Sequence, residues 1–199
     1  MTTRSSYLVP NLIIAGRVVL AFVAVGLFGV ASPWAAGTAV ALIVVVVAMD
    51  GLDGYLARRL DLTSELGGVL DITADRIVEH IFWIYFAVAG LVGLWVPLVV
   101  MTRSFLVDNA RGLALAHGKT AFGEGTMMRS PLTRFLTGSR FMRNLYGMAK
   151  VAAFVLLGAL VVVSRAEAVG AAPLSGPALS LLRVATRVSV WVAVALCVV

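Results

Sequence analysis

Charged residues and cysteine are both scarce in this sequence. Only 13% of its 199 residues are Asp, Glu, Lys or Arg, against about 25% in a typical soluble domain. In contrast, 61% of the residues are hydrophobic, and the mean hydropathy is +1.01. The chain contains one cysteine, Cys197, which excludes a disulfide framework within the chain and a cluster of thiolate metal ligands. These scarcities argue against an ordinary soluble domain and indicate a protein whose solvent is the bilayer.

The positive charge of the sequence does not indicate a nucleic-acid-binding protein. The formal net charge is +6, but the Lys and Arg residues lie between apolar runs and form no single basic stripe with interleaved aromatic residues. Such a distribution is typical of the polar loops of a membrane protein. The opening segment from Met1 to Tyr7 is short and polar, and no small-residue cleavage site follows the first apolar run, so we expect no cleaved signal peptide.

Long apolar runs divide the chain into predicted transmembrane helices. About 20 apolar residues are needed to cross the ~30 Å hydrocarbon layer of a bilayer, and runs close to that length recur along the chain. The predicted helices span residues 8–31, 34–58, 66–92, 95–116 and 144–163, and a sixth follows the segment from Pro173 to Pro177. Arg183 and Arg187 fall inside the sixth helix, so either their side chains snorkel or the helix starts at the interface. We therefore expect an all-α, polytopic membrane protein with about six transmembrane helices in a single domain, residues 1–199.

The basic residues of the connections predict the orientation in the membrane. Short cytoplasmic loops carry an excess of Lys and Arg, and here every second connection is basic whereas the alternate ones contain only Arg165. The basic side comprises Arg4, Arg58, Arg59, Lys119, Arg129, Arg134, Arg140 and Arg143. We therefore expect a multi-pass protein of the inner membrane with its N-terminus, and the charged ends of the second and third helices, facing the cytoplasm.

Four aspartates lie within two of the predicted membrane helices. Asp50 and Asp53 are three residues apart, and Asp71 and Asp75 are four apart, so each pair occupies one helical face. The short connection predicts that the two helices are antiparallel neighbours, which brings both pairs to one site. Carboxylates at such a distance repel one another unless cations compensate them, and ligands that are all oxygen favour Mg²⁺ or Mn²⁺. The pattern therefore predicts a divalent-metal site near the cytoplasmic surface.

Small residues and one arginine accompany the aspartates. Gly54 and Ala57 follow Asp53, and Gly67 lies one turn before Asp71. The small size of these residues allows the helices to approach closely or leaves room for a ligand. The guanidinium of Arg58 suits phosphate oxygens. The alternative is a pair of closely packed helices whose charged side chains snorkel to the surface.

The complete pattern, Asp50-x2-Asp53-Gly54-x2-Ala57-Arg58-x8-Gly67-x3-Asp71-x3-Asp75, resembles the signature of the CDP-alcohol phosphotransferase family at every fixed position. The resemblance implies six transmembrane helices, usually in a homodimer, and transfer of a substituted phosphate from a CDP-alcohol to an acceptor hydroxyl with release of CMP. It also implies roles for the matching residues. The ligands of a two-metal site would be Asp50, Asp53, Asp71 and Asp75, with Asp75 also the general base, and the CDP-binding residues would be Gly54, Ala57, Arg58 and Gly67.

Further residues resemble one branch of that family. Pro10-Asn11 followed by Arg17 is similar to the start of the first helix in bacterial phosphatidylglycerophosphate synthases, which use CDP-diacylglycerol. Arg103 and Arg111 resemble an arginine pair of the same branch. Three positions depart from it: Ser104 stands where an acidic residue is common, Ile72 stands where Pro is usual, and Arg76 stands where Lys is usual. An arginine at that last position is reminiscent of relatives that use inositol phosphate.

Basic residues near the expected site suit an acceptor that carries its own phosphate. The candidates for this contact are Arg103, Arg111, Arg140, Arg143 and Lys150, and the resemblance favours glycerol 3-phosphate as the acceptor. The alternatives are that the loop arginines bind anionic lipid headgroups, and that Arg103 and Arg111 form an internal ion pair with Asp108. Inositol phosphate, serine or another alcohol remains an alternative acceptor.

A different class of function is also compatible with carboxylates in membrane helices. A divalent-cation transporter would place them near the midplane, on broken or repeated helices. Here they lie toward one face and no internal repeat is visible, which favours the enzyme.

Overall fold

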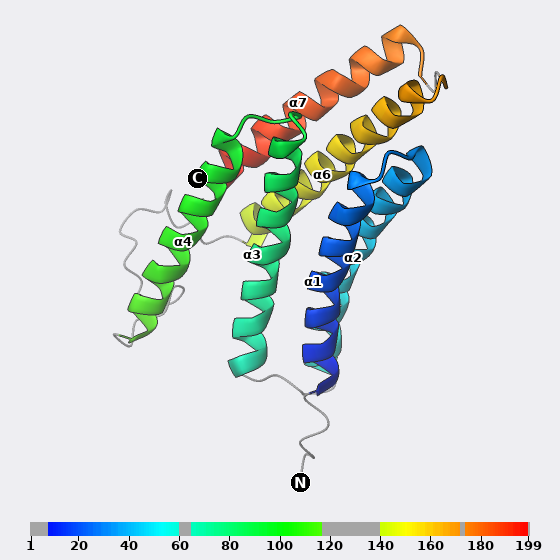
Figure 1. Ribbon diagram of the computed structural model, residues 1–199. Helices are drawn as coiled ribbons and strands as arrows, with labels where there is room; N and C mark the ends of the chain where they lie inside the picture. Colours follow the sequence, from blue (N-terminus) through cyan, green and yellow to red (C-terminus); the bar gives the residue numbers. More distant parts are fainter. Residues whose placement is uncertain (1–7, 60–64, 117–139, 172–173, 199) are drawn as a thin grey trace.

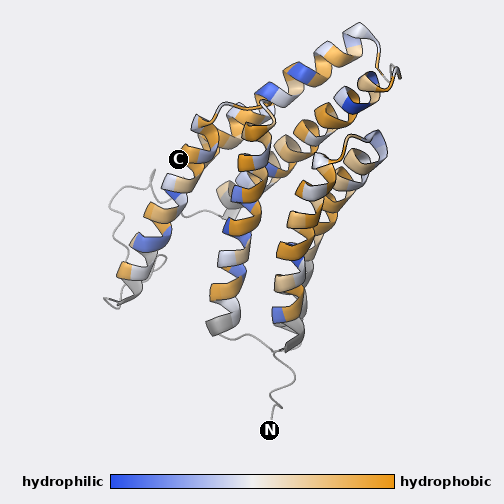
Figure 2. Cartoon of the chain, in the orientation of Figure 1, coloured by the Kyte–Doolittle hydropathy of each residue, from blue (hydrophilic) through white to orange (hydrophobic). Residues whose placement is uncertain are grey.

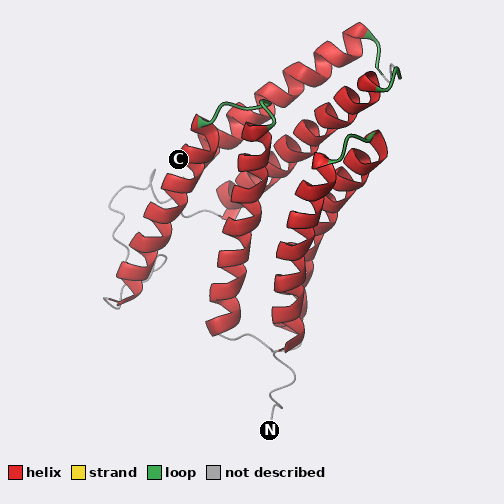
Figure 3. Cartoon of the chain, viewed as in Figure 1, coloured by secondary structure: helices red, strands yellow, loops and turns green. Residues whose placement is uncertain are grey.

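The computed structural model describes residues 8–59, 65–116, 140–171 and 174–198, and in these ranges all regular structure is helical (Figure 3). The helices are α1 (Leu8–Gly29), α2 (Pro33–Arg59), α3 (Glu65–Val88), α4 (Trp95–Ala116), α6 (Arg140–Ala168) and α7 (Gly176–Val198) (Figure 1). The prediction of an all-α, polytopic membrane protein is confirmed.

The helix boundaries differ from the predicted ones where glycine ends a helix. α3 stops at Val88 rather than at residue 92, because Gly90 adopts a φ of 73° and lets the amide of Leu91 donate to the carbonyl of Phe86 at 3.0 Å. α6 continues beyond residue 163 to Ala168, where Gly170 at a φ of 79° forms the corresponding turn. Left-handed backbone of this kind is accessible to glycine without steric strain, so these residues fix the helix ends.

Four described helices are long and apolar enough to cross a membrane. They contain the segments Asn11–Gly29, Pro33–Gly51, Asn144–Ala168 and Gly176–Val198. α3 and α4 are of similar length, but hydrophilic positions interrupt the apolar character of both helices (Figure 2). In α7, Arg183 and Arg187 are exposed on one uninterrupted helix.

α2 and α3 were predicted to be direct neighbours, but in the described residues each of them packs mainly against other helices. α1 packs against both of them, so the first helix lies against the pair that carries the aspartates (Figure 1). α6 packs against α2 and α7, and α4 contacts α3 and α7. The first three helices therefore form one packed unit, and α6 packs against the α2 side of it.

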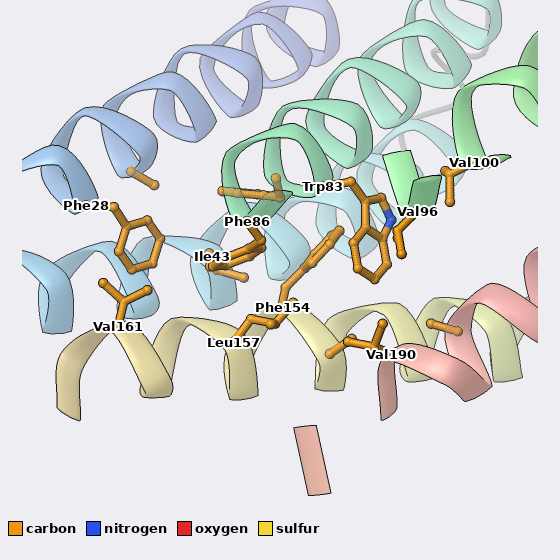
Figure 4. Packing of buried hydrophobic residues seen from close by; sticks show 14 of the residues in the cluster. Phe28, Ile43, Trp83, Phe86, Val96, Val100, Phe154, Leu157, Val161 and Val190 are labelled. Atoms are coloured by element: carbon orange, nitrogen blue, oxygen red, sulfur yellow. The ribbon is translucent and has the colours of Figure 1, made fainter. Parts of the chain in front are cut away.

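An apolar core joins α1, α2, α3 and α6. On α3, Trp83 and Phe86 are fully buried, and the Trp83 ring lies 4.9 Å from that of Phe154 on α6 (Figure 4). Phe28 of α1 lies 5.9 Å from Phe86. These aromatic contacts fix the position of α3, the helix that carries two of the aspartates.

Gly158 marks the closest approach of α6 to the first two helices. A Cβ atom at this position would lie 2.7 Å from Val40 Cγ2 and 3.2 Å from Phe28 Cζ. Because glycine has no side chain, the helices can pack at this distance, as small residues commonly allow in membrane bundles.

Candidate active site

Three of the predicted metal ligands meet at one place in the structure. Asp50 projects from α2, and Asp71 and Asp75 project from one face of α3. One carboxylate oxygen of each lies within 4.8 Å of the other two, and each side chain is a little under half exposed. We call these three residues the aspartate cluster.

Arg17 of α1 bridges the whole aspartate cluster. Its guanidinium contacts a carboxylate oxygen of Asp50 through Nη1, and through Nη2 it contacts Asp71 Oδ1 at 3.2 Å and Asp75 Oδ1 at 3.0 Å. The same Nη2 donates to the backbone carbonyl of Asp71 at 3.4 Å. The Arg17 side chain is only 1% exposed, so this charge is compensated by the cluster rather than by water.

The sequence analysis did not assign Arg17 to this site. It noted the residue only for its resemblance to one branch of the family. A signal was available, because Arg17 is the single charged residue of a helix of 22 residues, and an ionised group in a membrane helix normally has a partner or a function.

The donor set of the cluster fits a hard divalent cation. Three carboxylates and one guanidinium leave a formal charge of −2. The ligand atoms are oxygens, and they lie close enough together to share one ion. The residues present therefore suit Mg²⁺ or Mn²⁺ better than a softer metal.

The remaining signature residues lie on the same two helices. Asp53, Gly54, Ala57 and Arg58 belong to the last part of α2, and their side chains are outside the described part of the structure. Gly67 is half-buried in α3, one turn before Asp71. Thus the backbone places the predicted CDP-binding positions at the same ends of α2 and α3 as the aspartates.

A second set of polar side chains, which we call the Glu79 group, consists of Glu79, Arg76, Tyr146 and Lys150. Glu79 is fully buried and lies one turn beyond Asp75. Glu79 accepts a hydrogen bond from the hydroxyl of Tyr146, and its Oε2 lies 3.4 Å from Arg76 Nη1 and 3.5 Å from Lys150 Nζ. Arg76 also donates from Nε to Asp108 of α4 at 2.9 Å. Asp108, which was considered as a partner for Arg103 and Arg111, therefore connects α4 to α3.

A cavity of about 130 Å³ lies between the aspartate cluster and the Glu79 group. Its polar lining consists of Arg17, Asp50, Asp75, Glu79 and Lys150, and aliphatic and aromatic side chains complete it. A molecule in this cavity would meet both carboxylates and cations while being shielded from lipid by the apolar residues.

The five basic residues predicted for the acceptor do not all line this cavity. Lys150 lines it, whereas Arg103 lines an open, largely apolar groove of about 440 Å³ between α4 and α7. The side chains of Arg111, Arg140 and Arg143 lie outside the described residues. Arg140 and Arg143 belong to the first turn of α6, which begins four residues earlier than predicted.

Comparison with known proteins identifies the family. Residues 7–199 match the family model described as CDP-alcohol phosphatidyltransferase. The chain belongs to this family. The resemblance predicted from the signature is thereby confirmed.

Curated relatives of this CDP-alcohol phosphatidyltransferase family member carry several names. A putative cardiolipin synthase of Mycobacterium tuberculosis is 31% identical over 130 residues, which cover 65% of this chain and 61% of the relative. A CDP-diacylglycerol–glycerol-3-phosphate 3-phosphatidyltransferase of Pseudomonas fluorescens is 32% identical over 58% of this chain and 60% of the relative. An archaetidylinositol phosphate synthase of Pyrococcus horikoshii is 28% identical over 54% and 55%. The matched region therefore spans about three fifths of these relatives, and their names differ in the acceptor.

Proposed function

We propose that the protein transfers the phosphatidyl group of CDP-diacylglycerol to a small alcohol, with glycerol 3-phosphate as the first candidate, and releases CMP. The observation that carries this proposal is a cavity lined both by Asp50 and Asp75 of the aspartate cluster and by Lys150. The family match supports the reaction type, and the relative of Pseudomonas fluorescens supports the acceptor.

In this reaction the acceptor hydroxyl oxygen attacks the phosphorus that carries the diacylglycerol group. A new phosphorus–oxygen bond forms, the bond to the CMP oxygen breaks, and CMP leaves with the electron pair of that bond. Asp75 receives the proton of the acceptor hydroxyl. Asp75 is suited to this role because it belongs to the aspartate cluster and also lines the cavity.

Asp50, Asp53, Asp71 and Asp75 would hold Mg²⁺ or Mn²⁺, in a two-metal site according to the family pattern. Bound there, such ions neutralise charge on the two phosphates and stabilise the departing CMP. Gly54, Ala57 and Gly67 leave room for the CDP group, and Arg58 pairs with its pyrophosphate.

Lys150 is the strongest of the acceptor candidates. Its ammonium group lines the cavity beside Asp75, so it can pair with the phosphate of an acceptor whose hydroxyl faces that carboxylate. Arg103, Arg111, Arg140 and Arg143 would contact either the acceptor or the anionic headgroups of neighbouring lipids.

We further propose that the site faces the cytoplasm from the inner membrane and that the protein is a homodimer in a single-domain arrangement. The orientation rests on the basic connections at the end of the bundle where the cluster lies.

The test is CMP release by the purified full-length protein in lipid nanodiscs with CDP-diacylglycerol and Mg²⁺. Separate arms contain glycerol 3-phosphate, inositol phosphate, inositol, serine and phosphatidylglycerol. The lipid acceptor is included because relatives are named cardiolipin synthases, and cardiolipin is a phosphatidylglycerol that carries a second phosphatidyl group. A chelator should abolish release in the active arm.

Asp71→Asn removes one cluster charge with little change of volume and should abolish transfer while the protein stays folded. The matched control is Glu167→Gln, which makes the same change at an exposed position of α6 and should leave turnover unchanged. Full turnover in Asp71→Asn would contradict the metal-site assignment. No release in any arm by folded wild-type protein would contradict the proposed function, and divalent-cation flux would then be measured.

A further inference from the structure

Arg17 is an unusual component for a metal centre, because it places a positive charge among the ligands. It is the only charged residue of α1, and its guanidinium contacts all three aspartates of the cluster. Its side chain is 1% exposed, so the surrounding protein fixes its position.

The guanidinium and a bound cation depend on the same carboxylates. Arg17 contacts one oxygen from each of Asp50, Asp71 and Asp75, and its contact with the Asp71 backbone carbonyl also ties it to α3. These contacts come from one side chain and reach two other helices. Arg17 therefore acts as a cross-link between α1, α2 and α3 at the level of the cluster.

We propose that Arg17 is a positioning residue with two opposed effects: it holds the three carboxylates together and it weakens their affinity for divalent cations. This inference rests on the metal centre proposed above. Without Arg17, the three carboxylates repel one another with no internal compensation, which destabilises the protein when no cation is bound. A cation that enters the same cluster then meets a formal charge of −3 rather than −2, because the positive charge of Arg17 is gone.

The inference predicts two opposite changes in Arg17→Gln, a variant that keeps an amide donor but removes the charge. The Kd for Mn²⁺ should fall at least about tenfold. At the effective dielectric of a protein site, the repulsion between the ion and a unit positive charge a few Å away corresponds to more than a tenfold change in affinity. The unfolding temperature in chelator should fall, and the increase produced by saturating Mn²⁺ should be larger than in wild type.

The experiment uses the full-length protein in nanodiscs of zwitterionic lipid, so that headgroups contribute no anionic site. Free Mn²⁺ is measured by electron paramagnetic resonance during titration, and unfolding temperatures are recorded in chelator and in saturating Mn²⁺. The control is Arg187→Gln, which makes the same change at an exposed position of α7 and should alter neither quantity. Asp71→Asn identifies the part of the binding that belongs to the cluster.

Arg17→Lys keeps the charge but not the planar fork, and it serves if the Gln variant does not fold. Its Kd should stay within about threefold of wild type, because the charge is retained, whereas its unfolding temperature in chelator should be lower because a single ammonium cannot bridge three carboxylates as well. A Kd in Arg17→Gln equal to or higher than that of wild type, or a Lys variant that is as stable as wild type in chelator, would overturn the inference. Absence of Mn²⁺ binding in wild type, or equal binding in Asp71→Asn, would instead remove the proposed metal centre and this inference with it.

Discussion

Glu79 offers a quantitative test of the Glu79 group. Its side chain is fully buried and serves three donors, from Tyr146, Arg76 and Lys150. Glu79→Gln keeps the size and one acceptor oxygen but removes the charge. The hydrogen bond from Tyr146 can therefore persist, whereas Lys150 and Arg76 each lose their ionic contact with residue 79.

The expected loss of stability follows from these contacts. Removing one partner of a buried ion pair typically costs about 3–5 kcal/mol. Two features reduce that value here: both cationic side chains are 21% exposed, and Arg76 keeps Asp108 at 2.9 Å. We therefore expect a loss of about 2 kcal/mol, which corresponds to a decrease of about 4–8 °C in unfolding temperature for a chain of this size.

The assay is thermal unfolding in detergent, with Glu167→Gln as the control for loss of an exposed carboxylate. A double-mutant cycle with Lys150→Met isolates the pair. Because Lys150 is left without its anion in the single Glu79 variant, the double variant should lose less stability than the two single changes added together. A decrease below about 1 °C in Glu79→Gln, or strict additivity in the cycle, would refute the reasoning.

Three further results are expected. Gly158→Ala should lower the unfolding temperature, because overpacking costs about 1–3 kcal/mol. The control is Gly37→Ala, which should leave the unfolding temperature unchanged or raise it, because a new Cβ there would meet nothing within 4 Å. Equal effects of the two changes would contradict the packing described for α6. Lys150→Met should raise KM for a phosphorylated acceptor with little change in KM for CDP-diacylglycerol, as measured by steady-state kinetics with each substrate varied. An unchanged acceptor KM would contradict the assignment of Lys150 to the acceptor site. Arg76→Glu and Asp108→Arg should each destabilise the protein, and the exchanged pair should recover part of the loss in thermal unfolding; no recovery would exclude a direct interaction.

The sequence predicted the parts of this site that depend on spacing along one helix. Asp71 and Asp75 are four residues apart, so their common face follows from helix geometry once the apolar run is recognised. The short connection between the two helices predicted that Asp50 joins them at one site, and the family signature added the CDP-alcohol chemistry. The side chain of Asp53 lies outside the described residues, so its role as a ligand stays a prediction.

The contacts that α1 and α6 make with the charged residues of α2 and α3 were not predicted. A short connection between α2 and α3 indicates that they are antiparallel, but it does not reveal that α1 packs against both and supplies Arg17. Similarly, the spacing of Glu79 shows that it continues the aspartate stripe, yet its contacts with Tyr146 and Lys150 depend on how α6 is placed. A single charged residue in an apolar run has no spacing partner, so sequence alone identifies it as unusual without naming what it touches.

The distribution of the cluster along the chain has a consequence for biogenesis. Arg17, Asp50, Asp71 and Asp75 all belong to the first three helices, which end at Val88. During synthesis these helices reach the membrane before α4, α6 and α7 do, and each would bring an ionised group into a setting where unpaired charge is unfavourable. Mutual compensation by Arg17 and the aspartates gives this N-terminal unit a means of remaining inserted while the rest of the chain is made. The cavity is completed only later, when α6 delivers Lys150.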